Sequence, residues 1–540
     1  MSEWVSEWVR SPLAYVSLKY GKHEPQLSTV NPMGTLNRRK LLTWGLAGTV
    51  ATVSYRCAGL PFGSSRPSRL PSASLPISHR SEAGLLDLAL QAQAQAVPLG
   101  HQTATLLTYN GQVPGPTWEA KAGDTVRIHF TNQLTQPTNL HFHGLHIPPT
   151  GNADNVFLSV PSGGTQIYEF EIPAQHPGGL FWYHPHQHGV VAEQVFGGLA
   201  GPIIIRGAVD EIPEVQAAEE AIAVLQDFDL DGGGQVQEPL PIFRRWGRQG
   251  GLVTVNGIVG PSFTIPQAGL LRLRLLNASP SRIYRLHLEN HPWYLIGLDG
   301  GTLPEPVAIE ADLVLSPGER ADILVPGSQE PNEYALISRP YDRGIAEMMG
   351  QMGIQGDEID TTPVAIAHFQ YGEPTTAVPL PKTLIPAIAL PEPTIRREFI
   401  LDHGIDSDNA FLINGNGFDH HRIDTKVQLD TVEEWTLINK AGMDHPFHIH
   451  TNPFQVVKQN DQPFPYLVWK DVINVKPYES VVLRIAFTHF SGQSVYHCHI
   501  LDHEDQGMMG ILEIIDAAAG EMWRDTPTEV ALRDRSCLYV

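Results

Sequence analysis

Cysteine is scarce in this chain of 540 residues, which contains only Cys57, Cys498 and Cys537. Three cysteines exclude a secreted scaffold held together by a framework of disulfides. Basic residues are also few: 36 Lys and Arg stand against 58 Asp and Glu, which leaves a net charge of −22. Such a surface repels phosphate backbones and anionic lipid. The sequence therefore predicts no nucleic-acid partner.

A hydrophobic run long enough to span a bilayer is missing near the N-terminus. Thirteen weakly apolar residues, 41–53, follow the pair Arg38-Arg39, a length that suits the apolar region of a signal peptide. The arrangement resembles a twin-arginine export signal. It implies recognition by the twin-arginine export machinery, a location outside the cytoplasm, in the periplasm, and no other contact with a membrane.

The start of the chain has two interpretations, because the signal has normal proportions when counted from Met33 and an unusually long leader when counted from Met1. We expect an N-terminal extension and signal over residues 1–60. Residues 61–81, rich in Ser, Pro and Arg, are expected to form a flexible linker before the folded body.

An Asn-Gly turn followed by an alternating strand occurs three times, at Asn110, Asn256 and Asn414. The turns are 146 and 158 residues apart, which is the length of a domain and indicates triplication. Short strands, punctuated by 49 Gly and 44 Pro, are typical of Greek-key sandwiches or barrels. We therefore expect three similar β-domains and a C-terminal tail, over residues 82–210, 211–380, 381–520 and 521–540.

Histidine is abundant, with 24 residues, and four His-x-His pairs occupy matching places in the first and third repeats. Residues two apart on a strand face the same side, so both imidazoles can meet one metal ion or two adjacent ions. One pair is weak evidence, but four predict a metal cluster. The middle repeat keeps only His287 and is expected to be a spacer without ligands. The pairs are His141-Phe142-His143, His184-Pro185-His186, His448-Ile449-His450 and His497-Cys498-His499.

Cys498 lies between two of these histidines, and its side chain points to the opposite face of the strand, so one strand touches two metal sites. Two His, one Cys and a weak axial Met form the ligand field of blue copper. His445, His503 and Met508 supply the missing members. The alternatives are zinc, which closes at four ligands without an axial thioether, and a buried inert thiol.

With these motifs, residues 100–515 resemble the three-domain multicopper oxidases. The resemblance implies an all-β fold of three consecutive cupredoxin-like Greek-key β-sandwich domains. It also implies four copper ions: one type 1, one type 2 and two type 3. By position, the type 1 ligands are His445, Cys498, His503 and Met508, and the type 2 ligands are His141 and His448. The type 3 pair falls to His143, His184, His186, His450, His497 and His499.

The resemblance further implies that a donor gives single electrons to the type 1 copper and that the other three coppers reduce dioxygen to two waters after four electrons. Four protons must also arrive. Glu504 and Asp154 resemble the carboxylates that relay protons in this family, and the alternative for each is a solvated loop acid.

Three functions fit the motifs. The first is a laccase-like oxidation of phenolic or aromatic donors. The second is oxidation of Cu(I) or Mn(II), for which soft thioethers argue, although the same methionines could pack a domain interface. The third is a non-catalytic copper-binding scaffold, whose known relatives have lost ligand histidines that this chain retains. The methionines in question are Met348, Met349, Met352 and Met443.

Overall fold

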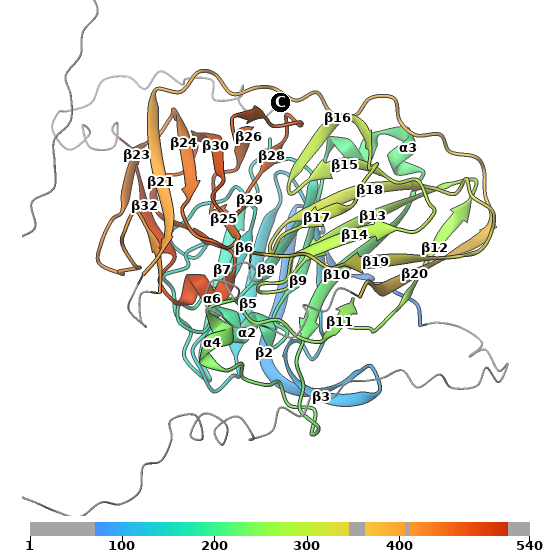
Figure 1. Ribbon diagram of the computed structural model, residues 1–540, viewed down its shortest axis with the longest axis horizontal. Helices are drawn as coiled ribbons and strands as arrows, with labels where there is room; N and C mark the ends of the chain where they lie inside the picture. The colour runs from blue at the N-terminus through green and yellow to red at the C-terminus, as the bar shows by residue number, and fades with distance from the viewer. Residues whose placement is uncertain (1–70, 345–361, 405–409, 517–540) are drawn as a thin grey trace, which may run out of the picture. The chain divides into compact units, whose positions relative to one another are not determined.

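The computed structural model describes residues 71–344, 362–404 and 410–516. The predicted all-β fold is confirmed: in this part of the chain, strands form six sheets, and the few helices are short (Figure 1). No helix in the described ranges combines the length and apolarity needed to cross a membrane. The predicted export signal and Met348, Met349 and Met352 lie outside the described residues.

The first pair of sheets belongs to the N-terminal part and encloses one hydrophobic core, with Trp118 and Phe130 fully buried in it. One sheet has the order β1(Ile77–Arg80), β4(Thr117–Lys121), β9(Gly201–Arg206), β8(Gly179–His184), β6(His141–His143); the other has the order β3(Gln102–Tyr109), β2(Leu85–Leu99), β5(Thr125–Asn132), β7(Thr165–Glu171). Helix α2(Val191–Phe196) lies between β8 and β9. The 3₁₀ helix η1(Ala208–Glu211) and helix α3(Pro213–Gln216) follow β9.

Strand β1 differs from expectation, because residues 77–80 fall in the segment predicted as a flexible linker. The strand pairs in parallel with β4, and Arg80 Nη1 donates to Glu119 Oε1 at 2.7 Å. Main-chain pairing and this ion pair order the end of the linker despite its polar composition.

The second pair of sheets follows in the chain and has a core that includes Tyr284 and Trp293. Its first sheet has the order β11(Leu252–Val255), β10(Glu219–Phe228), β13(Leu270–Asn277), β18(Arg320–Pro326), β15(Tyr294–Leu298), β16(Gly301–Ala308); its second has the order β12(Ser262–Gln267), β20(Val364–Pro374), β19(Glu333–Arg339), β14(Tyr284–Leu288), β17(Leu313–Leu315). The single-turn helix α4(Pro241–Arg244) lies between β10 and β11.

The third pair of sheets carries the C-terminal motifs around a core that contains Trp435, Phe447 and Cys498. One sheet has the order β22(Phe411–Ile413), β21(Ile395–His403), β24(Thr431–Asn439), β30(Ser480–Phe487), β26(Phe454–Gln459), β27(Gln462–Pro463), with β28(Trp469–Lys470) paired to β26; the other has the order β23(Thr425–Gln428), β32(Met509–Ile515), β31(Gly492–Cys498), β25(His445–Ile449), β29(Val472–Val475). Helix α6(Leu501–Asp505) joins β31 to β32.

The three repeated turns have the same structure. Asn110, Asn256 and Asn414 all have φ between 52° and 56°, and a positive-φ glycine follows each. Each asparagine side chain accepts a hydrogen bond from the backbone of the second strand before the turn, which is β2, β10 or β21. That strand pairs in parallel with the second strand after the turn, as in β2–β5, β10–β13 and β21–β24. Triplication therefore extends to individual hydrogen bonds.

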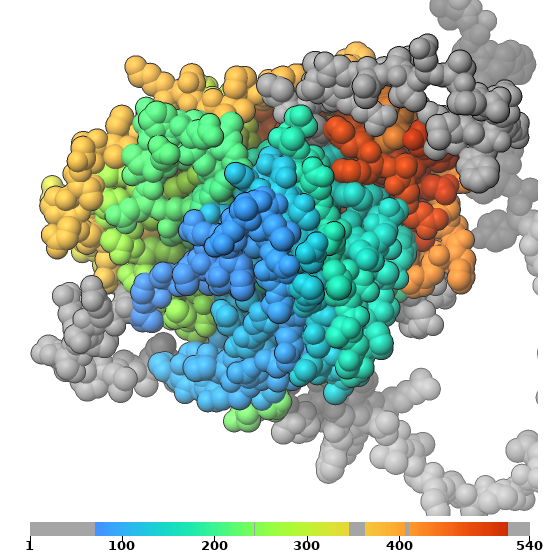
Figure 2. Space-filling model, turned by 180° about the vertical axis from the view of Figure 1, so that it is seen from behind, coloured from blue at the N-terminus to red at the C-terminus, as the bar shows by residue number. Residues whose placement is uncertain are grey.

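The first part of the chain contacts both others. Helix α2 packs against α6, and β8 packs against β18. In the space-filling view, first-domain residues, blue to teal, border both the green second part and the orange to red third part (Figure 2). Motifs that are about 300 residues apart in sequence can therefore meet.

Candidate metal centre

The four His-x-His pairs lie on four strands. In the first domain, β6 and β8 are antiparallel and place His141 opposite His184. In the third domain, β25 and β31 place His448 opposite His497. All eight histidines are at most 2% exposed. The period of two residues along each strand thus aims the imidazoles into one buried space, as the sequence predicts.

These imidazoles gather into two groups of three, each of which combines both domains. The first group is His143, His184 and His499, and the second is His186, His450 and His497; in each, one potential ligand atom per residue lies within 4.8 Å of the others. In the second group, Nε2 of His497 is 3.1 Å from Nε2 of His450 and 3.2 Å from Nε2 of His186. His141 and His448 form a further pair, with 3.4 Å between their Nε2 atoms.

The outer nitrogens of several rings are held by backbone carbonyls. Nδ1 of His184 lies 2.9 Å from the Pro185 carbonyl, and Nδ1 of His497 lies 3.0 Å from the Cys498 carbonyl. Nδ1 of His448 lies 2.7 Å from the Asp471 carbonyl. An Nδ1–H that donates to a carbonyl leaves the lone pair of Nε2 free for a metal ion.

Several of the inward nitrogens lack partners. Nε2 of His184, both ring nitrogens of His499 and Nδ1 of His143 are buried and have no hydrogen-bond partner among the described residues. Burial lowers the pKa of His184 to about 3 and that of His186 to about 4, so both rings are neutral, which is the form that binds metal. Unpartnered, neutral imidazoles fit copper ions as ligands.

The Cys498 side chain faces a separate group on the other side of β31. Its Sγ is 3.5 Å from Nδ1 of His445 and 3.6 Å from Nδ1 of His503, and the two Nδ1 atoms are 3.2 Å apart. Met508 is fully buried in the same core, and its carbonyl accepts a hydrogen bond from the Cys498 N–H at 3.0 Å. Two His, one Cys and a nearby Met match the donor set of blue copper.

Asp154 and Glu504 both lie against the histidine groups, so neither is a solvated loop acid. Oδ1 of Asp154 is 2.8 Å from Nδ1 of His141 and accepts a hydrogen bond from the Phe142 N–H at 2.9 Å. Burial raises the pKa of Asp154 to about 8, against the opposing effect of that hydrogen bond.

Glu504 is fully buried on α6. Its Oε2 is 3.1 Å from Nδ1 of His497, and its Oε1 is 3.5 Å from Nδ1 of His186. Burial alone would raise the pKa of Glu504, but these two histidines bring it below its usual value. The carboxylate is therefore ionised beside the second group of histidines, where it can accept a proton.

A third carboxylate was missed by the sequence analysis. Oδ1 of Asp471 is 2.9 Å from Nε2 of His143, and both oxygens of Asp471 accept hydrogen bonds from the guanidinium of Arg320. Arg320 belongs to the second domain, which was expected to be only a spacer. The sequence did contain a signal for this carboxylate, the pair Lys470-Asp471 within the apolar stretch 468–475. Charged side chains in such a stretch are expected to be buried and therefore to need partners.

Met443 is 4% exposed and lies in the same hydrophobic cluster as Cys498 and Met508. Its side chain is buried in the third-domain core, and its carbonyl accepts a hydrogen bond from the Asn439 side chain. This environment agrees with the packing interpretation of that methionine.

Comparisons with known proteins assign the chain to a family. Two family models, both described as multicopper oxidase, match residues 91–209 and 391–517. The multicopper oxidase mco of Staphylococcus haemolyticus is 30% identical over 420 residues, which cover 76% of this chain and 83% of that protein. The chain belongs to the multicopper oxidase family.

Other members of the family and related folds carry different descriptions. A solved structure of a Campylobacter jejuni multicopper oxidase, described as a metallo-oxidase, is 30% identical with a TM-score of 0.73 and covers 83% of this chain and 97% of its own. A laccase from Pediococcus acidilactici is 31% identical with a TM-score of 0.70 and covers 84% and 94%. Cell division protein FtsP of Yersinia pestis is 29% identical over 494 residues, 89% of this chain and 99% of that protein. These relatives are thus described variously as a metallo-oxidase, a laccase and a cell division protein, and the multicopper oxidase family, to which the chain belongs, uses copper.

Proposed function

We propose that this multicopper oxidase takes single electrons from phenolic or other aromatic donors and reduces dioxygen to water. The observation that carries the proposal is the complete set of converging side chains, in which no position of the predicted ligand set is lost. Copper bound there supplies one-electron oxidation and reduction. His445, Cys498, His503 and Met508 would hold one copper ion, His141 and His448 a second, and the two groups of three histidines the remaining pair.

The chain itself contributes a short connection between these sites. His497 and His499 belong to the histidine groups, and Cys498 between them belongs to the Cys–His group. Their backbone is continuous along β31, and it is fixed by pairing with β25 and β32. We infer that this strand is the route between donor side and dioxygen side.

Glu504 is proposed to deliver protons to the histidine groups. In Glu504→Gln, we expect the copper content and the blue colour to be retained while kcat falls by about 100-fold, because an amide cannot release a proton. Oxygen uptake and copper analysis measure both quantities. Glu513→Gln, on strand β32 after helix α6 and paired with exposed Lys426, is the control and should leave kcat unchanged. An unaltered rate in Glu504→Gln would contradict the relay.

Two other functions remain as alternatives. Likeness to the Campylobacter jejuni metallo-oxidase favours Cu(I) or Mn(II) as donor. Likeness to FtsP favours a role as a protein of cell division, although the full set of histidines argues for catalysis. We also propose export by the twin-arginine machinery and a periplasmic location, on the strength of Arg38-Arg39 and the apolar run after them.

Oxygen consumption by the copper-loaded full chain separates these functions. A methoxyphenol and Cu(I) are supplied in separate assays, and peroxide is measured in each. Uptake with the phenol, at four electrons per dioxygen and without peroxide, is the result we expect. Uptake with Cu(I) alone would assign a metallo-oxidase, and no uptake with either donor would favour the non-catalytic scaffold.

A further inference from the structure

A segment of the second domain contacts the loop between β31 and β32, which contains helix α6 and carries His503. Residues 244–248, which we call the second-domain strap, begin at the last residue of helix α4. The Arg245 carbonyl lies 3.1 Å from Nε2 of His503, and the Arg244 carbonyl accepts a hydrogen bond from the Gln506 side chain at 3.3 Å. The ring nitrogen of His503 that faces away from Cys498 is therefore capped, and His503 is fully buried.

A buried ion pair joins the strap to the residue before His503. The Arg248 N–H donates to Oδ2 of Asp502 at 2.7 Å, and its guanidinium donates to Oδ1 from Nε and Nη2 at 3.1 and 3.0 Å. The two side chains are only 5% and 3% exposed. Charge-assisted, bidentate hydrogen bonds of this kind fix geometry as well as adding energy. The orientation of the loop is thereby tied to the strap.

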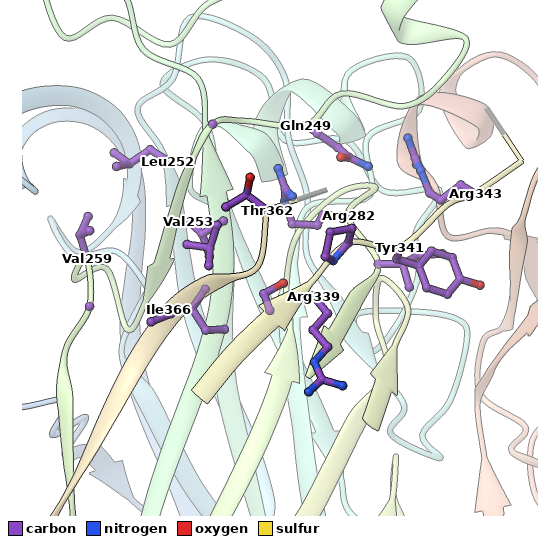
Figure 3. Close-up of a pocket in the computed structure, with 17 residues that line it drawn as sticks. Gln249, Leu252, Val253, Val259, Arg282, Arg339, Tyr341, Arg343, Thr362 and Ile366 are labelled. Carbon is purple, nitrogen blue, oxygen red and sulfur yellow. The ribbon is translucent and has the colours of Figure 1, made fainter. Parts of the chain in front are cut away.

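Arg343 holds the strap from the other side. Its Nη2 donates to the Trp246 carbonyl at 2.6 Å and its Nη1 to the Ser281 carbonyl at 2.8 Å. Its own carbonyl accepts from the N–H of Asp444, the neighbour of His445, at 3.4 Å. Figure 3 shows Arg343 at the side of a second-domain pocket that lies toward the third-domain ribbon. Arg343 therefore connects the strap, which caps His503, to the residue before His445.

Gly247 allows the strap to lie this close. Its φ is +77°, and an added Cβ would be 2.6 Å from Cγ2 of Ile500 and 2.6 Å from Cβ of Ser281. Ile500 is two residues after Cys498 and donates its N–H toward Sγ at 3.4 Å. A larger side chain at position 247 is strained by the positive φ and requires the strap, Ile500 or Ser281 to shift.

We propose that the second-domain strap is a fixed cover over the Cys498 site, which orients His503 and prevents bulky donors from touching its imidazole. The second domain then acts as more than a spacer, because it limits which donors reach the site. The part of the proposal that concerns donors rests on the proposed function. The part that concerns the cover depends only on the contacts of the metal-free chain.

The test compares Gly247→Ala with Gly251→Ala, because a Cβ at Gly251 meets nothing within 4 Å. Both are made in a Cys57→Ser, Cys537→Ser background, so that Cys498 is the only thiol. In the copper-free chain, we expect iodoacetamide to alkylate Cys498 about tenfold faster in Gly247→Ala, because the cover opens more often. Gly251→Ala should match the parent.

The copper-loaded variants give a second readout. In Gly247→Ala we expect a shifted blue absorption band and electron paramagnetic resonance signal, and a larger ratio of the rate with a bulky phenol to that with a small phenol. Equal alkylation and equal spectra in the two glycine variants would overturn the cover. A parent that binds no copper or consumes no oxygen would overturn the proposed function and leave the alkylation result standing.

Arg343→Lys keeps the test decisive where Gly247→Ala does not fold. The ammonium group retains the charge but cannot reproduce the planar fork that reaches two carbonyls. We expect the same direction of change, with faster alkylation of Cys498 and a shifted spectrum. Unchanged alkylation in a folded Arg343→Lys chain, with its melting temperature measured alongside, would also contradict the cover.

Discussion

Replacing Cys498 by serine is expected to abolish the blue colour and to reduce oxygen uptake with any donor to the background rate. The serine hydroxyl lacks the soft, ionisable sulfur that copper requires in this geometry. The site should then keep Met508 and the two histidines His445 and His503, whose Nδ1 atoms are 3.2 Å apart. The histidine groups on the other face of β31 are left intact, so most of the copper should remain bound. Visible spectra, copper analysis and oxygen uptake measure these effects.

The matched control for this substitution is Cys57→Ser together with Cys537→Ser, because neither cysteine belongs to any of the sequence motifs that predict copper ligands. That variant should keep its colour and its rate. A serine variant of Cys498 that remains blue and active would refute the assignment of Cys498 as a ligand. Its thermal unfolding should resemble that of the parent, since serine is nearly isosteric with cysteine and the site is otherwise unchanged.

The fold and the histidine groups could be predicted from the sequence because both depend on local periodicity. An Asn-Gly turn sets two positive φ values wherever it occurs, and His-x-His on a strand sets two side chains on one face. Repetition of both patterns carried the prediction from single segments to whole domains. Cys498, His445 and His503 were found in the same way, by motif and spacing.

The contacts made by the second domain could not be predicted. Asp471 and Arg320 are 151 residues apart and come from different domains, and no periodicity links them. The strap that caps His503 contributes a backbone carbonyl, which any residue type could supply. Loss of the histidine pairs from the middle repeat made it look like a spacer, because ligand motifs are visible in a sequence whereas buried supports for ligands are not.

Arg320→Met is expected to destabilise the copper-free chain by about 3–5 kcal/mol, because it leaves the buried Asp471 without its charged partner. Arg320 is fully buried, and it also donates to the carbonyls of Leu180 and Gly318. Asp471 is also no longer fixed by Arg320 in its position against Nε2 of His143, so copper binding should weaken as well. Denaturant unfolding and copper titration measure the two effects.

Arg285→Met is the matched control in the same domain, since its ion pair with Asp312 involves a side chain that is 48% exposed. Exposed pairs contribute about 0–1 kcal/mol, so this variant should unfold near the parent. In the double variant Arg320→Met, Asp471→Asn the uncompensated charge is gone, and we expect part of the stability to return without full copper affinity, because an amide supports His143 less well than a carboxylate. Equal stability of Arg320→Met and Arg285→Met would show that the second domain does not support the histidine groups through this pair. A double variant less stable than Arg320→Met alone would show that Asp471 contributes to folding independently of its charge partner.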